Sequence, residues 1–441
     1  MAAHKQTREI IHRLLNTIGS EQEIQQYLRR YSDLDADKFA VVKVGGAILQ
    51  KALPALTSAL VFLQRVGLTP IVVHGAGPQL NAKLAEHGIN SQVVDGYRVT
   101  TPEVLKYARK VFLQENMNIV ETLRKSNTPA ASITSGVLEA EILDDGRYGM
   151  VGKIKDVNLD VIRHCLDGGM LPIVSPLGET ADGQIVNINA DVVTNALVRA
   201  VQPYKVIFLT ETGGILNQHD RVISSVNLST DLDDLLAQEW LHSGMRLKVE
   251  QIASLLHDLP PTSSVSITHP DYLARELFTH KGSGTLIRVG ESILKYGDWN
   301  DVDQRQLREL IESSFGRRLV SDYSEHKPLL SAYVSQNYRA AAVITDNDGL
   351  PWLDKFAVTD KAQGEGLGKA VWDAVRTGHE SLFWRARPNN PINSFYFRQA
   401  DGALKTDSWN VFWYGIDDMN RVQRCVEVAD QTAATLGEAI E

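Results

Sequence analysis

Cysteine is scarce in this sequence, and so are long apolar runs. Cys165 and Cys425 are the only cysteines among 441 residues, and they are too few and too far apart for a disulfide framework or a metal cluster. No apolar run approaches the roughly 18 residues that a membrane span needs, and the amino-terminal stretch lacks the continuous apolar segment of a secretory signal. These absences predict a cytoplasmic protein with no membrane partner and no metal site of its own.

Positive charge is also in short supply. Lysine and arginine number 45 against 54 aspartates and glutamates, which gives a formal net charge of -9. Such a balance argues against nucleic acid as a partner, so anionic ligands would have to meet local pockets of lysine and arginine. The 43% of hydrophobic residues is typical of a globular protein with large cores, and the length predicts two or three domains.

Residues 1–37 are expected to form a helical segment. Apolar residues recur at helical spacing from Thr7 to Ile18, and "SEQE" at Ser20 to Glu23 has the form of a capping box that opens a second helix. The apolar stripe of the first helix leaves two interpretations open, packing on its own domain or docking on a second subunit, and we expect a homo-oligomer. The residues expected to face inward are Ile10, Ile11, Leu14, Leu15, Ile18, Ile24, Tyr27, Leu28 and Tyr31.

Short β-branched runs alternate with glycine turns and helical stretches from Phe39 to about Val289. This alternation predicts an α/β domain over residues 38–290, built as a three-layer structure around a mainly parallel sheet. Ligands of such sheets bind at the carboxyl ends of the strands. The runs are "FAVVKVGG", "PIVVHGAGP", "LPIVSPLG", "KVIFLTETGG" and "SSVSITH".

The rhythm breaks at the hydrophilic run from Lys295 to Ser314, so we place a domain boundary near residue 290. Residues 291–441 are expected to form an α/β domain with a mixed, mostly antiparallel sheet and few helices. Its strand-like runs are "LLSAYVSQ", "AAAVITD", "LPWLDKFAVT", "SLFWRAR" and "WNVFWYG", with a turn at "DNDG".

Two glycine turns follow strands of the first domain, "KVGG" after Val42 and "HGAGP" after Val73. Their glycines let backbone N–H groups approach a phosphate closely, and Lys43 at a strand end could neutralise a transferred phosphoryl group. Either turn alone is better explained as an ordinary strand-to-helix connection. Asp191 in "NINAD" and Lys248 in "GMRLK" have ordinary interpretations too, as a first-turn acid behind an N-cap and as a solvated lysine.

Seven segments together resemble the amino-acid kinase family, and specifically its N-acetylglutamate kinase branch, over about Phe39 to Arg288: "KVGG", "HGAGP", "GYRVTT", "NINAD", "ETGG", "GMRLK" and "KGSGTLI". The resemblance implies phosphorylation of the side-chain carboxylate of N-acetyl-L-glutamate by ATP with Mg²⁺. Ala76 departs from the family, where many relatives have glycine, and its N–H can persist as a donor if its φ is negative. The resemblance implies two strand-end catalytic lysines, Lys43 and Lys248, oriented by Asp191; a substrate grip of Arg98 and Asn187; and a phosphate cradle of Gly45, Gly46, Gly75 and Gly77.

A third glycine segment, "KAQGEGLGKAVW", follows the strand-like "DKFAV" and opens a helix. It fits Q/R-x-x-G-x-G/A with Gln363, Gly366 and Gly368, a turn that aims backbone N–H groups and a helix N-terminus at a pyrophosphate. The spacings of a nucleotide-kinase loop and of a dinucleotide fingerprint are both missing.

This segment resembles the GCN5-related N-acetyltransferases, and the surrounding "LDKFAV", "LFWRARPNNPINSFYFRQADG" and "WNVFWYG" are similar to the vertebrate-type N-acetylglutamate synthase domain. The resemblance implies acetyl transfer from acetyl-CoA to L-glutamate, with Tyr396 protonating the departing thiolate. Without it, Tyr396 would be core and Arg385 a surface cation. The residues expected to bind acetyl-CoA are Phe356, Val358, Gln363, Gly364, Gly366 and Gly368, and those expected to bind glutamate are Lys355, Arg385 and Asn390.

The expected function is therefore bifunctional, with two consecutive steps of arginine biosynthesis on one chain. We assign no general base for the acetyl transfer, because no histidine or carboxylate is an obvious candidate. "ARELFTHKGSGTLI" resembles the arginine-binding segment of arginine-sensitive kinases, so Glu276, Gly282 and Gly284 are expected to bind L-arginine as an inhibitor, although a helix ending in a glycine turn explains it equally well. Two alternatives remain, an acetyltransferase whose kinase-like domain only senses arginine and a non-catalytic sensor that binds partner proteins.

Overall fold

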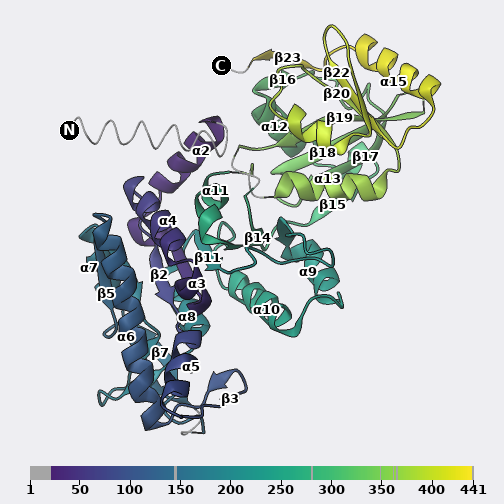
Figure 1. Cartoon of the computed structure of the whole chain (residues 1–441). Coiled ribbons are helices and arrows are strands. Elements are labelled where there is room, and N and C mark those ends of the chain that lie inside the picture. Colours follow the sequence, from purple (N-terminus) through teal and green to yellow (C-terminus); the bar gives the residue numbers. More distant parts are fainter. Residues whose placement is uncertain are drawn as a thin grey trace. The chain divides into compact units, whose positions relative to one another are not determined.

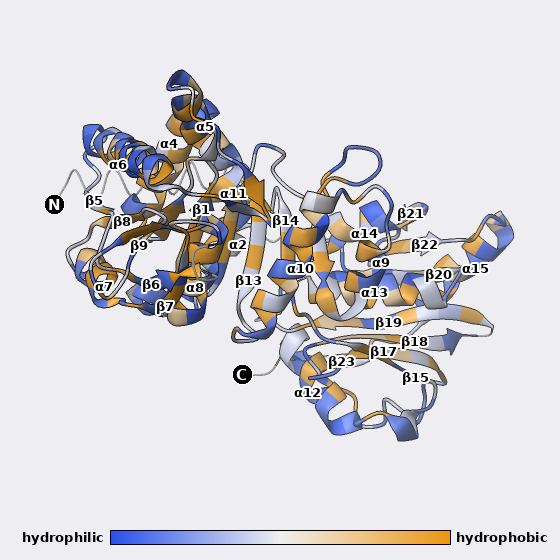
Figure 2. Cartoon of the chain, turned by 90° about the horizontal axis from the view of Figure 1, so that it is seen from below, coloured by the Kyte–Doolittle hydropathy of each residue, from blue (hydrophilic) through white to orange (hydrophobic). Residues whose placement is uncertain are grey.

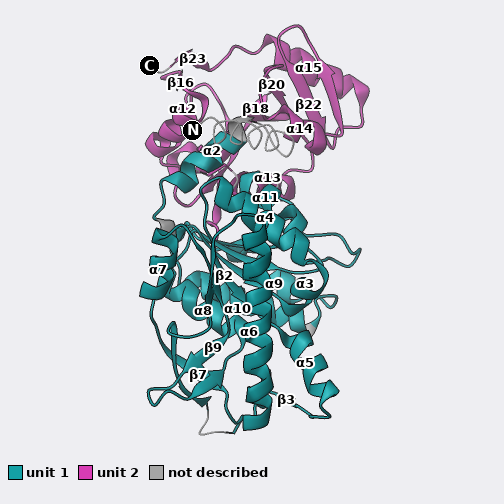
Figure 3. Cartoon of the chain, turned by 60° about the vertical axis from the view of Figure 1, so that its left-hand side comes forward, with its two compact units in different colours: residues 1–289 teal, residues 290–441 magenta. Residues whose placement is uncertain are grey.

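The computed structural model describes residues 21–143, 147–279, 282–347, 349–360, 362–363 and 366–439. The chain forms two compact units, Met1–Val289 and Gly290–Glu441 (Figure 3). The predicted helix over Thr7 to Ile18, the capping serine Ser20 and Gly364 lie outside the described residues. Among the residues described, no helix is both long and apolar enough to cross a bilayer.

An eight-stranded sheet forms the centre of the first unit (Figure 1). Its strands are buried β-branched runs, as expected for a sheet covered on both faces. All neighbouring strands pair in parallel except β13 and β14, so the predicted mainly parallel sheet is confirmed. The strand order is β12 (Ser225–Asn227), β14 (Thr285–Arg288), β13 (Ser264–Thr268), β11 (Lys205–Leu209), β1 (Ala40–Val44), β2 (Ile71–His74), β8 (Leu171–Val174) and β5 (Ala130–Ile133).

Helices cover both faces of this sheet, so the unit has the three predicted layers. Val41 and Val42, successive residues of β1, belong to different hydrophobic clusters, because side chains alternate between the faces of a strand. In Figure 2 helix α6 shows both hydrophilic and hydrophobic residues, as expected for a covering helix. The helices are α2 (Glu21–Ser32), α3 (Gly46–Lys51), α4 (Leu53–Arg65), α5 (Gly77–Glu86), α6 (Pro102–Lys125), α7 (Asp160–Asp167), α8 (Ala190–Val201), α9 (Leu228–Leu236), α10 (Ser243–His257) and α11 (Leu273–Phe278), with 3-10 turns at Ala36–Lys38 and Pro270–Tyr272.

Helix α2 packs on its own unit. Ile24, Tyr27 and Tyr31 are buried as predicted, and Leu28 is partly buried against the same cluster. The Tyr31 hydroxyl donates to the Leu277 carbonyl at 2.6 Å. This bond ties α2 to α11, because a buried hydroxyl needs a partner.

Two smaller sheets extend the first unit beyond the central sheet. The pair β3 (Val93–Val94) and β4 (Tyr97–Arg98) is antiparallel. A four-stranded sheet has the order β10 (Ile185–Asn187), β9 (Leu177–Glu179), β6 (Leu138–Ile142) and β7 (Gly152–Val157).

The second unit is built on a seven-stranded sheet. Its neighbouring strands are antiparallel except β19 and β20, which confirms the predicted mixed, mostly antiparallel sheet. The one parallel pairing is short, with a single register pair, Trp352 with Phe383, among the described residues. The order is β15 (Ile293–Tyr296), β17 (Leu329–Ser335), β18 (Ala340–Asn347), β19 (Leu350–Val358), β20 (Leu382–Ala386), β22 (Asn410–Tyr414) and β21 (Gly402–Lys405).

Helices lie on both faces of this sheet too. Residues of α13 (Leu367–Gly378) and α14 (Asn393–Gln399) join the cluster that contains Trp384, whereas α12 (Gln304–Phe315) and α15 (Met419–Gln431) join clusters on the opposite face with Ala357 and Phe383. A 3-10 turn spans Trp299–Asp301, and a two-stranded ribbon pairs β16 (Arg317–Leu319) with β23 (Leu436–Ala439). The start of the hydrophilic run at Lys295 belongs to a strand, β15.

A buried histidine closes the carboxyl end of β2. His74 has no exposed surface, and its Nε2 atom accepts from Asn116 Nδ2 at 3.2 Å and lies 3.1 Å from Ser175 Oγ. Burial lowers the pKa of His74 to about 4, so the imidazole is neutral at physiological pH.

Acidification should therefore destabilise the first unit before carboxylates are protonated. The unfolded chain binds a proton at His74 below about pH 6.5 and the folded chain only below about pH 4, so stability falls as pH drops between these values. The loss should total roughly 3 kcal/mol. Urea unfolding from pH 7 to pH 4 measures it, and His74→Gln should flatten that part of the profile; an equally steep profile in the variant would assign the loss to other groups.

Candidate functional site

Three predicted catalytic residues of the first unit lie together. Lys43, near the end of β1, forms an ion pair with Asp191 in the first turn of α8, with Nζ and Oδ1 3.0 Å apart. Desolvation lowers the pKa of Lys248, and the positive charge of Lys43 lowers it further while Asp191 opposes both effects. The Lys248 ammonium also lies 5.2 Å from the ring centroid of Phe208. Lys43 thus pairs directly with Asp191, and Lys248 lies close enough to feel the charges of both.

Lys248 does not lie at a strand end as the family resemblance implies. It belongs to the second turn of α10, and it is half-buried rather than solvated. Leu247 beside it is 55% exposed, whereas Val249 is fully buried. Position 248 therefore lies at the border of the helix's buried face, where a lysine stem is covered and its ammonium can reach β11.

The two glycine turns of the first unit pack against each other. A Cβ atom on Gly46 would lie 2.8 Å from both Gln79 Oε1 and Pro78 Cδ, and Gln79 Nε2 donates to the Gly46 carbonyl at 2.8 Å. Gly75 N–H donates to the Val44 carbonyl at 2.9 Å. The two turns begin α3 and α5, which brings two helix N-termini to the ends of β1 and β2.

None of the four predicted cradle glycines has a positive φ. Gly46 needs glycine because of the close approach of Pro78, whereas Gly77 has open space around its Cβ position. Ala76 has a φ of -147°, which alanine adopts without strain, so its N–H remains a possible donor.

The two predicted grip residues are joined by a chain of hydrogen bonds. Asn187 Nδ2 donates to Thr100 Oγ1 at 3.1 Å, and the Thr100 hydroxyl donates to the Arg98 carbonyl at 2.8 Å. The Arg98 guanidinium donates to Asn81 Oδ1 at 2.5 Å and to Ser91 Oγ at 3.1 Å. Its partners are neutral, so the guanidinium retains a full positive charge for an anionic ligand.

The glycine segment of the second unit leads into α13. Gly366 is the N-cap with a φ of 77°, a left-handed conformation that favours glycine. Gly368 packs close to Val358, and a Cβ atom there would lie 3.2 Å from Val358 Cγ2. Gln363 Nε2 donates to Asp360 Oδ1 at 3.2 Å. The helix N-terminus and the turn thus lie beside the end of β19, and a helix N-terminus favours an anion.

Lys355 is buried among charged groups. Its ammonium bonds the Asp354 carboxylate and donates to Thr435 Oγ1 at 2.6 Å. Burial by itself would raise the pKa of Asp354, but Lys355 and Lys327 outweigh it and hold that pKa at about 2. The Tyr323 hydroxyl donates to the same carboxylate at 2.7 Å. Asp354 therefore stays ionised and fixes both lysines.

Arg385 lies on the same face of the sheet. Its guanidinium donates to the carbonyls of Ala429 and of Thr432, the latter at 2.8 Å, and lies 4.0 Å from the ring centroid of Trp409. Arg387 approaches the same ring to 3.9 Å.

Tyr396 lies on the opposite face of that sheet. It packs with Trp384, Phe412 and Phe356, and burial raises its pKa well above the ordinary value for tyrosine. Phe356 and Val358 belong to the same cluster as Tyr396. Asn390 lies in the turn before α14, where its side chain accepts from Ile392 N–H at 3.2 Å. The predicted glutamate ligands and Tyr396 are therefore not gathered on one face.

Glu276 is buried on α11, and backbone N–H groups of the glycine turn that follows bind its carboxylate. Its Oε2 atom accepts from the N–H groups of Ser283 and Gly284 at 2.8 and 3.0 Å. A Cβ atom on Gly282 would lie 2.5 Å from that oxygen. Glu276 thus shapes the turn, and effector binding there stays a prediction.

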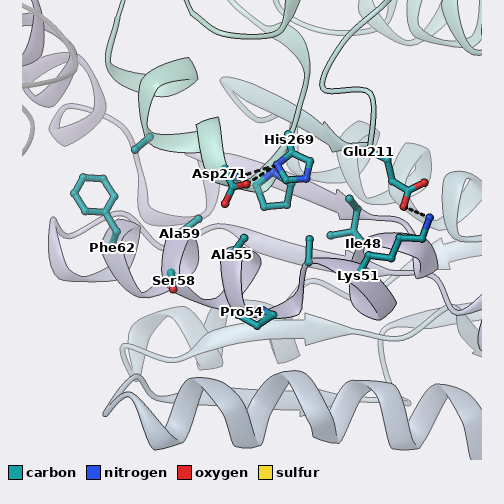
Figure 4. Close-up of a pocket in the computed structure, with 13 residues that line it drawn as sticks. Ile48, Lys51, Pro54, Ala55, Ser58, Ala59, Phe62, Glu211, His269 and Asp271 are labelled. Carbon is teal, nitrogen blue, oxygen red and sulfur yellow. Dashed lines mark hydrogen bonds and ion pairs between the residues drawn. The ribbon is translucent and has the colours of Figure 1, made fainter.

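A cavity of about 720 Å³ opens beside α4 (Figure 4). Lys51 and Glu211 form an ion pair of 2.8 Å at its edge, and His269 lies 3.2 Å from Asp271 on its wall. None of its lining residues was singled out by the sequence.

Four polar residues around Lys355 were missed by sequence reasoning. Asp354 had a signal, since it precedes Lys355 directly in "LDKF". Tyr323, Lys327 and Thr435 had none, because they approach from segments far along the chain. The described part of the chain has no group of three or more His, Cys, Asp or Glu side chains arranged to hold a metal ion.

Comparison with known proteins matches both units to families. Residues 38–261 match the amino acid kinase family, and residues 294–432 match the N-acetyltransferase domain of N-acetylglutamate synthase. The acetylglutamate kinase of Xanthomonas campestris is 55% identical over 414 residues, 93% of this chain and 97% of that protein. Human mitochondrial N-acetylglutamate synthase is 35% identical over 421 residues, 93% of this chain and 76% of that protein.

One solved structure supports the fold over nearly the whole chain. N-acetylglutamate synthase from Neisseria gonorrhoeae, crystallised with coenzyme A and N-acetylglutamate, aligns with a TM-score of 0.60. The alignment covers 93% of this chain and 96% of that one, at 19% sequence identity.

Packing of the two glycine turns predicts unequal effects of the same substitution. Gly46→Ala should destabilise the first unit by about 1 to 3 kcal/mol, because its methyl group would collide with Pro78. Gly77→Ala should change its stability by no more than about 0.5 kcal/mol, because Gly77 is exposed and no atom beyond its chain neighbours lies within 4 Å of the added methyl group. Urea unfolding of both variants tests the packing, and equal stabilities would show that the turns do not touch.

Proposed function

The chain belongs to the amino acid kinase family and carries the N-acetyltransferase domain of N-acetylglutamate synthase, and on that premise we propose that it is a bifunctional enzyme of arginine biosynthesis. Its second unit transfers the acetyl group of acetyl-CoA to L-glutamate, and its first unit phosphorylates the product with ATP. The observation that carries the kinase assignment is the Lys43, Asp191 and Lys248 cluster.

Phosphoryl transfer brings two anions together. The side-chain carboxylate of N-acetyl-L-glutamate attacks the γ-phosphorus of ATP, the bond to the bridging oxygen breaks, and ADP leaves. Catalysis then depends on positioning and positive charge. Lys43 and Lys248 supply that charge, while Asp191 holds them in place. Arg98 and Asn187 would bind the substrate carboxylates, and the turns at Gly45, Gly46, Gly75 and Gly77 the phosphates.

Magnesium fits this site only when the phosphates of the nucleotide bind it. Asp191 is committed to Lys43, and the described residues offer no cluster of acidic ligands. Mg²⁺ is commonly held by substrate phosphates with few protein ligands. Bound in that way, it would neutralise the phosphate oxygens.

Acetyl transfer needs an amine, a thioester and a proton for the leaving thiolate. The glutamate nitrogen attacks the thioester carbon, the carbon–sulfur bond breaks, and the thiolate takes a proton to give free coenzyme A. The high pKa of Tyr396 keeps it protonated over the physiological pH range, so it can hold that proton. Phe356, Val358 and the turn from Gln363 to Gly368 would bind the cofactor, and Lys355, Arg385 and Asn390 the acceptor.

Lys355 and Arg385 lie on one face of the sheet and Tyr396 on the other, so the bound acceptor can meet Tyr396 only where the sheet is open. The strands β19 and β20 share a single register pair, so their carboxyl-terminal halves, which carry Lys355 and Arg385, are not joined by a described ladder. A substrate lying between these strands would meet both faces.

Small molecules are the partners that the two sites favour. We propose L-arginine as an inhibitor bound near Glu276, a homo-oligomeric and cytoplasmic enzyme, and no nucleic-acid or membrane partner. The rival assignment, an acetyltransferase whose first unit only senses arginine, leaves the clustering of Lys43, Lys248 and Asp191 without a purpose.

Separate assays of ADP and free thiol test the bifunctional assignment. Lys43→Ala should lower ADP release at least about 100-fold, since it removes a charge on the transferring phosphoryl, and leave thiol release intact. Gly366→Val should do the reverse, because a β-branched residue resists a φ of 77° and fills the space at the helix N-terminus. Lys51→Ala, which removes an exposed lysine near Gly46, serves as the control and should leave both rates unchanged. Loss of both activities in folded Lys43→Ala would contradict two separate sites.

Arginine inhibition should depend on the charge of Glu276. Glu276→Gln keeps an oxygen for the N–H groups of Ser283 and Gly284 but loses the charge that a guanidinium would meet. We expect the inhibitory concentration of L-arginine to rise about tenfold, or ~1.4 kcal/mol, with little loss of uninhibited turnover. Unchanged inhibition would exclude Glu276 as the effector ligand.

A further inference from the structure

The carboxyl-terminal segment of the second unit covers both cations of the predicted acceptor site. We propose that this strap, defined as residues 432–439, is a gate that occupies Lys355 and Arg385 in the absence of acceptor and is displaced when L-glutamate binds. The inference rests on the acetyl transfer proposed above. It assigns the strap a role that follows from the hydrogen bonds of these two cations.

Lys355 has no spare donor while the strap is in place. An ammonium group has three N–H donors, and those of Lys355 meet the Asp354 carboxylate, the Asp354 carbonyl at 3.2 Å and Thr435 Oγ1 at 2.6 Å. Asp354 is held in turn by Tyr323 and Lys327. An incoming carboxylate must therefore displace one of these acceptors, and the Thr435 hydroxyl is the neutral one that the strap supplies.

Arg385 is engaged in the same way. Its guanidinium donates to the carbonyls of Ala429, Thr432 and Ala433, where α15 ends and the strap begins. In this state it caps the helix, as cations often do. A carboxylate offers the guanidinium an opposite charge and two parallel N–H···O bonds, which neutral carbonyls cannot supply together, so the acceptor can compete for it.

The strap itself is weakly held. Among the described residues β23 pairs only with the short strand β16, in the registers Arg317 with Ala439 and Leu319 with Leu436, and Thr435 O accepts from Val320 N–H at 3.1 Å. Ala433, Ala434 and Gly437 are exposed. A two-stranded ribbon with little buried surface is marginally stable, so its opening requires little free energy.

The charges beneath the strap match a dicarboxylate. Lys327, Lys355, Arg385 and Arg387 carry four positive charges within this cluster, and Asp354 and Asp430 neutralise two of them. Two positive charges remain for the two carboxylates of L-glutamate. The carbonyls and hydroxyl of the strap solvate these charges but do not neutralise them.

Hydrogen exchange of the full-length protein distinguishes a gate from a fixed wall. Coenzyme A replaces acetyl-CoA so that no turnover occurs, and exchange is compared with and without saturating L-glutamate. Peptides covering residues 429–439, and the amide of Val320, should exchange faster with glutamate, because displacement of the strap breaks its pairing with β16 and the bond from Val320 N–H to the Thr435 carbonyl. Slower or unchanged exchange there would overturn the gate.

The same experiment separates failure of the gate from failure of the proposed function. Coenzyme A should protect the start of α13 whether or not the strap moves, and thiol release with acetyl-CoA and glutamate reports the reaction itself. Absence of both would contradict the acetyltransferase assignment. Their presence with a protected strap would contradict only the gate.

A matched pair of threonine substitutions gives a second test. Thr435→Val removes the hydroxyl from Lys355, destabilises the closed strap, and should lower the KM for L-glutamate about 3- to 10-fold, because a larger fraction of the protein is open. Thr432→Val is the control, since its hydroxyl donates to the Val428 carbonyl and touches neither cation. It should leave that KM unchanged. A KM for glutamate that rises or stays constant in Thr435→Val would make the strap part of the site and overturn the gate.

Discussion

The first unit must hold two lysine ammonium groups near one carboxylate, and its organisation follows from this constraint. Lys43 and Lys248 repel each other, and burial penalises the charge of Lys248, while the negative charge of Asp191 attracts both. Bringing them together requires a strand, a helix N-terminus and a second helix to meet at one edge of the sheet. The parallel arrangement of β1, β2 and β11 supplies that edge, because their carboxyl ends coincide. The packing of the Gly46 and Gly75 turns follows from the same need, since each turn begins a helix beside Lys43.

The second unit meets a similar electrostatic problem with different means. Lys355, Lys327 and Arg385 gather around one ionised Asp354, and tyrosine and tryptophan rings cover the remaining surface of the cations. Neutral carbonyls and a hydroxyl complete their coordination. A carboxylate is a stronger partner for a cation than these neutral groups are. The unit therefore favours an anionic ligand in their place.

Much of the fold could be predicted from the sequence, because the periodicity of apolar residues is a local signal. The runs ending at Val44, His74 and Leu209 became strands of a parallel sheet, and the antiparallel character of the second sheet followed from its short strands and turns. The N-cap before Asp191 and the helix opened by the third glycine segment were also visible locally. Lys248 was misplaced at a strand end, since the family resemblance describes a role and not the element that carries it.

What the sequence could not indicate depends on contacts between distant segments. Thr435 meets Lys355 across 80 residues, and no pattern near either residue announces the contact. The placement of Tyr396 opposite Arg385 was hidden for a related reason, because the face that a residue occupies depends on strand register.

The lowered pKa of Lys248 makes the site vulnerable to modification by its own product. A lysine that loses its proton more readily is a better nucleophile, and under the proposed function this amine lies beside a freshly formed mixed anhydride of a carboxylic and a phosphoric acid. Attack by the enzyme's own amine would form an amide and inactivate the site permanently. Asp191 counteracts this hazard, since its negative charge favours the protonated, unreactive form of Lys248. The carboxylate that orients the lysines thus also protects the enzyme from its own product.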